Sequence, residues 1–216
     1  MATDAVLHRT RPARSGWGLT LCIGAALLLG SLLLLALAGT GEAGVRMWTR
    51  ATARASVALF LLAFVARPLR RFWQGSASAW LLANRRYLGV SAAFAELLHG
   101  IALVWLFRAF ATAEQAPDAQ TLIGGGLGFA LYFAMALTSS DAAVAALGRR
   151  AWKTLHTIGA YWVWFIFALT NWGNVQLALS GELGLAHQVL YVGIQAALFA
   201  ALAFRILARI RSNALG

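Results

Sequence analysis

The run from Trp17 to Ala38 constrains this chain more than any other stretch, because it contains no charged side chain. A helix of about 22 residues, rising about 1.5 Å per residue, is long enough to cross a hydrocarbon core of about 30 Å. The other interpretation is a signal peptide with a cleavage site at Ala36-Leu37-Ala38. The apolar region of such a peptide is only about 7–15 residues long. We therefore expect a retained membrane helix.

The composition of the whole chain also indicates a membrane protein. Of its 216 residues, 61% are hydrophobic and 12% are charged, whereas soluble domains are about half apolar and a quarter charged. The net charge of +11 could indicate nucleic-acid binding. The basic residues, however, occur in twos and threes between apolar runs and form no stripe interleaved with aromatic residues. We therefore expect contact with a lipid bilayer and no nucleic-acid partner.

Six apolar segments are long enough to be membrane spans or nearly so. They cover about residues 17–38, 49–65, 87–110, 122–137, 152–172 and 185–207. Pro68, within a basic cluster, predicts the end of the second segment. Residues 72–84 are too mixed to cross and are expected along the inner surface, while polar residues 138–141 predict a cap after the fourth segment. The sequence thus predicts an all-α integral membrane protein, a bundle of six transmembrane helices.

The basic residues predict the orientation of this bundle. In the six-helix arrangement, one side of the membrane carries both termini and 14 of the 18 basic residues, at positions 9, 11, 14, 67, 70, 71, 85, 86, 149, 150, 153, 205, 209 and 211. The positive-inside rule then places both termini in the cytoplasm. The expected divisions are a cytoplasmic N-terminal tail (1–16), a six-helix domain (17–208) and a cytoplasmic C-terminal tail (209–216).

His99 lies in the middle of the third segment, where an ionisable side chain is costly unless it faces the bundle interior and has a partner. Small residues precede it, and Gly100 follows it, so the surface is flat enough for a porphyrin. The alternative is a hydrogen bond between helices. Glu96, one turn earlier, could orient His99, relay a proton or pair with an arginine such as Arg54.

His156 lies in the fifth segment, with Gly159 and Ala160 on the same helical face. These small residues either clear space beside the imidazole or allow close helix packing. Two such helices in one chain favour a cofactor, and neutral imidazole is the usual axial ligand of a b-type haem. The one cysteine, Cys22, allows neither an intramolecular disulfide nor a CxxC motif, so redox chemistry would depend on a bound cofactor. His187 is expected at the membrane interface, or alternatively as a ligand of an outer haem.

Three stretches resemble the ferric reductase-like transmembrane domain family, and within it the haem-binding membrane subunits of bacterial periplasmic methionine sulfoxide reductase systems. They are Arg85-Arg86-x-Leu88-Gly89 with Leu98-His99, Leu137-Thr138-Ser139, and Leu147-Gly148-Arg149-Arg150-x-Trp152-x-x-Leu155-His156. The resemblance implies one or two b-type haems whose iron is ligated by His99 and His156. The family usually has a second histidine further along the fifth helix, where this chain has Leu169-Thr170-Asn171. Further ligands or neighbours of a ligand would then be Glu96, Arg86, His187 and Asn171.

The resemblance also implies a function and partners. A multi-pass subunit of the bacterial inner (cell) membrane would carry electrons from a cytoplasmic flavin reductase or a membrane quinol to a periplasmic acceptor such as a methionine sulfoxide reductase. Partners would supply FMN or quinone, because no nucleotide-binding motif is present, and turnover by this oxidoreductase subunit would need those partners. The alternative is a cofactor-free membrane protein, either a proton-coupled transporter that uses Glu96 and His99 or a structural subunit.

Overall fold

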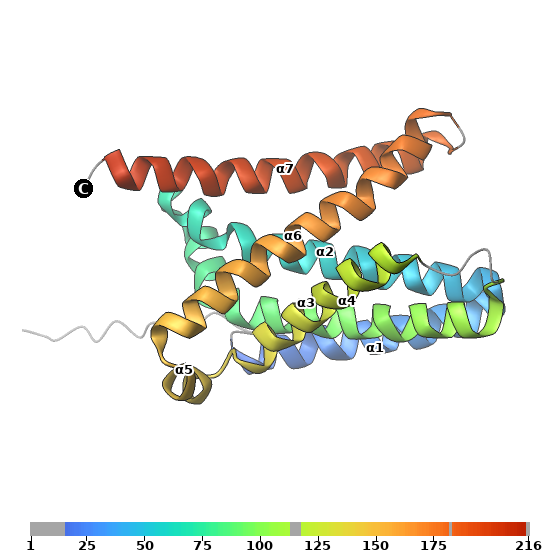
Figure 1. The fold of residues 1–216 in the computed structure, drawn as a ribbon, viewed down its shortest axis with the longest axis horizontal. Coiled ribbons are helices and arrows are strands. Elements are labelled where there is room, and N and C mark those ends of the chain that lie inside the picture. The colour runs from blue at the N-terminus through green and yellow to red at the C-terminus, as the bar shows by residue number, and fades with distance from the viewer. Residues whose placement is uncertain (1–15, 113–117, 182, 215–216) are drawn as a thin grey trace, which may run out of the picture.

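The computed structural model describes residues 16–112, 118–181 and 183–214, and no strand occurs among them. Their helices are α1 (Trp17–Ala38), α2 (Glu42–Phe72), α3 (Ser76–Phe110), α4 (Ala119–Leu137), α5 (Asp141–Leu147), α6 (Arg149–Leu179) and α7 (Leu185–Ala214) (Figure 1). The predicted all-α class is thereby confirmed. Residues 1–15 of the predicted N-terminal tail lie outside the described residues.

Four helices, α1, α2, α3 and α7, are long and apolar enough to cross a membrane. The pair α4 and α5 makes a fifth candidate, although it is bent by 108°. With 31 residues, α6 has the length to cross, but it is not among the helices that contain a sufficiently apolar stretch of membrane-spanning length. The described helices therefore provide four or five candidate spans, and the expected span over 152–172 is not one of them.

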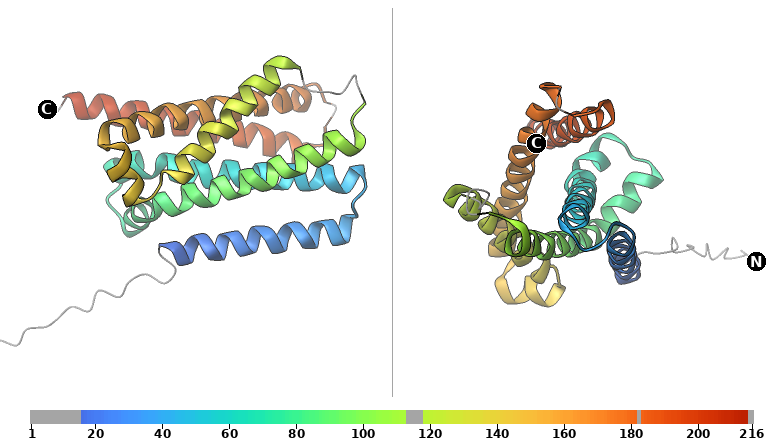
Figure 2. Two further views of the ribbon diagram at one scale, coloured as in Figure 1. Left: turned by 60° about the horizontal axis from the view of Figure 1, so that its bottom comes forward. Right: turned by 90° about the vertical axis from the view of Figure 1, so that its right-hand side faces the viewer.

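The helices pack around α2, which contacts α3 over most of its length and also touches α1 and α7. On the other side of the molecule, α4 packs against both α3 and α6, and α6 packs against α7 (Figures 1 and 2). One core cluster joins side chains from five helices. Its buried members are Phe60, Phe64, Ala92, Ala93, Tyr132, Ala160, Val163 and Ala201.

Helix α2 continues through Pro68 to Phe72, so the prediction that the helix ends at this proline is wrong. A proline lacks the N–H that would bond to the carbonyl four residues earlier, here Phe64. That carbonyl instead accepts a hydrogen bond from Arg205 of α7 at 3.3 Å, and the Arg205 guanidinium also lies 4.0 Å from the centroid of the Phe64 ring. A neighbouring helix thus supplies the missing donor, which is how proline is tolerated inside membrane helices.

The helix bounds otherwise agree with the expected spans at several ends. Helix α1 has the predicted bounds, and α3 and α4 end at the predicted residues Phe110 and Leu137. Residues 76–84, expected as a separate surface segment, form the first turns of α3, because no proline or glycine interrupts them. Helix α5 was not predicted. It follows the polar residues after α4, where the Ser140 hydroxyl accepts a hydrogen bond from the Ala143 backbone N–H at 3.0 Å.

Gly148 makes the connection from α5 to α6, with φ 76°. This left-handed conformation suits a residue without Cβ. It allows α6 to start immediately after α5, at Arg149. The bend between α4 and α5 and the turn at Gly148 together bring the start of α6 beside the end of α4, and this arrangement positions the candidate site.

Candidate functional site

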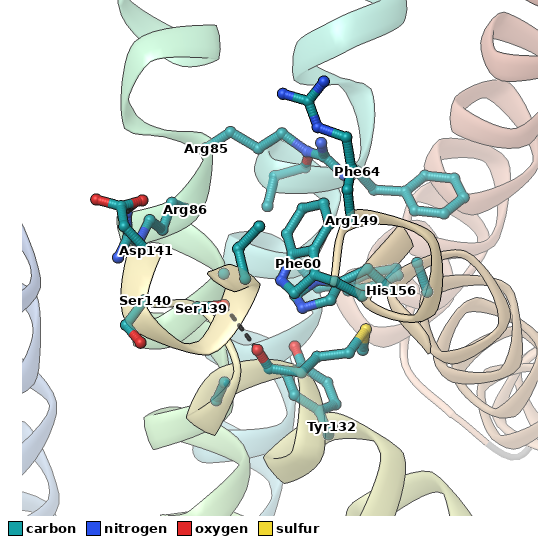
Figure 3. A pocket seen from close by; sticks show the side chains of 17 residues that line it. Phe60, Phe64, Arg85, Arg86, Tyr132, Ser139, Ser140, Asp141, Arg149 and His156 are labelled. Carbon is teal, nitrogen blue, oxygen red and sulfur yellow. Dashed lines mark hydrogen bonds and ion pairs between the residues drawn. The ribbon is translucent and has the colours of Figure 1, made fainter. Parts of the chain in front are cut away.

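A cavity of about 390 Å³ lies between α2, α3, α4, α5 and α6, beside the bend between α4 and α5 (Figure 3). Sites for small molecules and cofactors typically measure about 300–1,000 Å³. Its apolar walls are formed by Phe60, Ala63, Phe64, Met135, Ala136, Val144 and Ala160. Its polar lining includes Arg85, Arg86, Tyr132, Ser139, Ser140, Asp141, Arg149 and His156.

His156 is the histidine that lines this cavity, and contacts with α4 and α6 fix its ring. Its Nε2 atom lies 3.1 Å from the Thr138 hydroxyl, and its ring stacks on Trp152 with centroids 4.2 Å apart. The Trp152 indole in turn donates a hydrogen bond to the Thr138 carbonyl at 2.9 Å. The end of α4 therefore holds the imidazole in one orientation at the cavity wall.

Three arginines line the same cavity and make it receptive to anions. In Figure 3 Arg85 and Arg149 lie above His156, and the Arg85 Nε donates to the Ala63 carbonyl at 3.1 Å. Arg86 forms an ion pair with Asp141 at 3.0 Å, but the Asp141 side chain is 96% exposed, and exposed pairs contribute little. Arg86 Nε is buried and has no hydrogen-bond partner among the described residues. Buried donors usually have an acceptor, and a bound carboxylate could be that acceptor.

His99 lies elsewhere, between α2 and α4. Its Nδ1 atom is 3.1 Å from the Thr49 carbonyl oxygen, and its ring stacks on Phe129 with an interplanar angle of 13° and centroids 6.3 Å apart. Gly100 permits this approach, because a Cβ there would lie 3.1 Å from the Phe129 ring. His99 is not among the residues that line the cavity. The structure therefore does not bring the two predicted haem ligands to one site.

Glu96 is 7% exposed, and its Oε2 atom has no hydrogen-bond partner among the described residues. Arg54, one partner considered for it, instead lies 3.3 Å from the Tyr191 hydroxyl. Glu96 is next to Ser56, whose hydroxyl is 3.4 Å from the hydroxyl of Tyr132 in the cavity wall. A short polar chain thus runs from the cavity to Glu96.

Asn171 and His187, two other candidates, do not line the cavity. The Asn171 amide is 8% exposed and donates to the Tyr191 carbonyl at 2.9 Å and to Gln195 Oε1 at 2.8 Å. Both acceptors belong to α7, so Asn171 joins α6 to α7. His187 is exposed at the start of α7, and its ring centroid is 6.3 Å from that of Tyr191.

Sequence reasoning did not find the parts played by Thr138, Tyr132 and Met135. Thr138 stands out in the sequence only within a stretch that carries the resemblance, and a threonine after an apolar segment gives no sign that it contacts a histidine 18 residues later. The small residues near His156 divide their roles. A Cβ at Gly159 would lie 2.8 Å from the Met135 sulfur, so Gly159 serves close helix packing, whereas Ala160 lines the cavity.

The residues of the cavity fit a haem. Apolar walls suit the macrocycle, His156 suits its iron, and the arginines suit its two carboxylates, including the unpaired buried Nε of Arg86. The described residues contain no cluster of three or more His, Cys, Asp or Glu side chains that could hold a metal ion by themselves. Iron at this cavity would therefore be held mainly by its macrocycle, with protein groups completing the axial positions.

Fold and cavity together define a multi-pass, all-helical membrane protein with a cofactor-sized cavity that contains a histidine. Three curated relatives share one name, protein-methionine-sulfoxide reductase haem-binding subunit MsrQ. The chain is 30% identical to the Azospira oryzae protein over 79% of its own length, 30% identical to the Herminiimonas arsenicoxydans protein over 64%, and 32% identical to the Ralstonia nicotianae protein over 51%. The chain belongs to the family of these MsrQ subunits.

The similarity covers only part of each relative. The chain spans 66%, 64% and 51% of the lengths of the Azospira, Herminiimonas and Ralstonia proteins, respectively. No protein-family model matches the chain. No solved structure matches it either.

Proposed function

We propose that this chain is a membrane subunit that binds b-type haem and carries electrons across the inner membrane for the reduction of methionine sulfoxide. The observation that carries this proposal is the cavity in which His156, apolar walls and three arginines meet. The curated relatives support it, because their names state that they are haem-binding subunits of a protein-methionine-sulfoxide reductase.

A haem in the cavity would supply a one-electron carrier. His156 would hold its iron through Nδ1, because the Thr138 hydroxyl engages Nε2 at 3.1 Å, while Trp152 stacks on the imidazole with centroids 4.2 Å apart. Arg86, with Arg85 and Arg149, would bind the carboxylates. The phenylalanine and alanine side chains of α2, α4 and α6 exclude water, which keeps the local dielectric low and helps to set the potential.

We also propose that α6 crosses the membrane with the other helices, which gives six spans and places both termini in the cytoplasm. The ends of helices that carry basic residues support this orientation, because they meet at one end of the bundle (Figure 1). Arg71, at the end of α2, donates to the Ala208 carbonyl near the end of α7 at 2.7 Å. Arg86, near the start of α3, pairs with Asp141 at the start of α5. The cavity opens beside this basic end, where a cytoplasmic donor would approach.

The proposed electron path runs from that end outward. The donor is a cytoplasmic flavin reductase, with FMN as its cofactor, or a membrane quinol. The acceptor is a periplasmic methionine sulfoxide reductase. The domain proposed to hold the haem is the six-helix region over 17–208, flanked by the tails 1–16 and 209–216.

The test is haem content per chain in purified protein, measured for the wild type and for His156→Ala. We expect a b-type absorption spectrum from the wild type and loss of most of the haem from His156→Ala. The matched control is His187→Ala, which removes an exposed histidine outside the cavity and should retain the wild-type haem content. The variant His99→Ala reports on a second haem. If one is bound near His99, this variant would contain less haem per chain than the wild type but would keep the haem in the His156 cavity. Full haem content in His156→Ala would refute the assignment of the cavity.

A second candidate function rests on the buried Glu96 carboxyl, whose Oε2 lacks a partner among the described residues. In that case the chain would be a cofactor-free, proton-coupled transporter that uses Glu96 and His99. Glu96→Gln would then abolish proton uptake by vesicles containing the protein, and the purified wild type would be colourless after expression with ample haem. A coloured wild type whose haem depends on His156 would contradict this alternative.

A further inference from the structure

We propose that the His156 cavity supplies one strong axial ligand and leaves the facing position of the haem open to a small diffusible ligand, such as carbon monoxide or imidazole. This inference rests on the proposed function, because it concerns the iron of the haem assigned to the cavity. It depends on which side chains in each wall of the cavity could bind iron.

The wall formed by α2 contains no side chain with a lone pair to offer. Its lining residues are Phe60, Ala63 and Phe64. Phe60 and Phe64 are buried in the central core, and their rings contact each other with centroids 5.1 Å apart. This wall can exclude water but cannot ligate.

The wall formed by α3 is also without a ligand. It consists of Arg85, Arg86 and Gly89. A guanidinium remains protonated in proteins and has no lone pair free for a metal. A Cβ added at Gly89 would find no atom within 4 Å, so this part of the cavity is open space. Helix α3, on which the resemblance places the haem ligand His99, therefore leaves open space at the cavity and contributes no ligand there.

The hydroxyl and carboxylate groups contributed by α4 and α5 already have partners. The Tyr132 hydroxyl lies 3.4 Å from Ser56, and the Ser139 hydroxyl donates to the Met135 carbonyl at 2.7 Å. Ser140 caps α5, and Asp141 is paired with Arg86. These groups are hard oxygen donors that are already engaged in contacts within α4 and α5 or with α2 and α3.

Met135 is the remaining donor in the lining. Its sulfur packs beside Gly159 of α6, one helical turn from His156 and therefore on the same side of the cavity. A neutral thioether is a weak donor. We expect carbon monoxide or imidazole to bind whether or not this sulfur is present.

His99 does not supply the missing ligand. Its ring is stacked on Phe129 and its Nδ1 atom faces the Thr49 carbonyl, and His99 is not among the residues that line the cavity. Among the described residues, the cavity therefore contains one imidazole, that of His156. Access to the open side then decides whether a haem only transfers electrons or also binds small molecules.

The experiment uses the full chain, purified with its haem in detergent and reduced with dithionite. Carbon monoxide is added, and the difference spectrum is recorded. We expect the wild type to give a carbon monoxide complex, and imidazole to change the spectrum of the oxidised protein. Gly89→His places an imidazole in the open space of α3 and should abolish carbon monoxide binding while haem content is kept. Gly89→Ala is its matched control and should bind carbon monoxide as the wild type does.

Two further variants separate the outcomes. His99→Ala and Met135→Leu should both retain carbon monoxide binding. A wild type that is loaded with haem but gives neither a carbon monoxide nor an imidazole complex would overturn the inference, as would carbon monoxide binding that appears only when His99 or Met135 is removed. A wild type without haem would instead refute the proposed function itself. The imidazole titration needs no variant, so the inference stays testable if Gly89→His fails to fold.

Discussion

Replacing Asn171 by leucine removes the polar link between α6 and α7 while keeping a side chain of similar size. Asn171 is buried and donates two hydrogen bonds, at 2.9 Å to the Tyr191 carbonyl and at 2.8 Å to Gln195 Oε1. Hydrogen bonds between membrane helices contribute about 0.6 kcal/mol on average and about 1.7 kcal/mol at most. Two of them predict a loss of about 1–3 kcal/mol, and Gln195 is left with a buried acceptor that has lost this donor.

The assay is unfolding of purified protein by a denaturing detergent, with the free energy of unfolding compared between variants. Asn174→Leu is the matched control. This residue is half-buried on the same helix, and its amide donates only to the Thr170 carbonyl of its own helix at 3.4 Å, so we expect no measurable loss. Haem content per folded chain should remain at the wild-type value in both variants, because neither residue lines the cavity.

Two results would refute this reasoning. If Asn171→Leu were as stable as Asn174→Leu, the two contacts with α7 would not stabilise the fold. If Asn171→Leu kept its stability but changed the absorption spectrum of the haem, Asn171 would be a ligand in place of the histidine usual in the family. The second result would also require the haem to lie away from the His156 cavity.

Two other positions give separate predictions. A Cβ at Gly44 would overlap the backbone carbonyl oxygen of Gly39, so Gly44→Ala should destabilise the fold by about 3 kcal/mol. Gly41→Ala has no atom within 4 Å of its Cβ and changes only the N-cap residue of α2, so it should cost about 1 kcal/mol or less. The side chain and backbone N–H of Thr121 hold the pKa of the Asp118 carboxyl below its usual range. The cap that Asp118 provides is therefore fully present above the ordinary pKa of about 4 and is lost as the pH falls through the lower folded value. Amide exchange at Thr121 should be faster in Asp118→Ala than in the wild type at neutral pH, and equal in the two at strongly acidic pH. A difference that persists at acidic pH would contradict this assignment.

The sequence by itself determined the class of protein, because long uncharged runs can bury their backbone in lipid only as helices. It also determined the bounds of α1 and the ends of α3 and α4, which follow from where the apolar residues stop. The histidines were identifiable as candidates for the same local reason, since an ionisable residue in an apolar segment stands out. The resemblance to haem-binding membrane subunits, read from the stretch leading to His156, agrees with the MsrQ relatives.

The tertiary structure alone decided what each of these residues contacts. Pro68 does not end α2, since Arg205, far along the chain, donates to the freed Phe64 carbonyl. His156 reaches the cavity, but His99 is held by Thr49 and Phe129, and no periodicity within one helix could show this separation. The physical reason is that the apolar and charged residues of one segment determine how that segment is solvated, and therefore whether it forms a membrane helix. The site depends on which helices pack together, and this is set by contacts such as Gly159 with Met135 between residues distant in the chain.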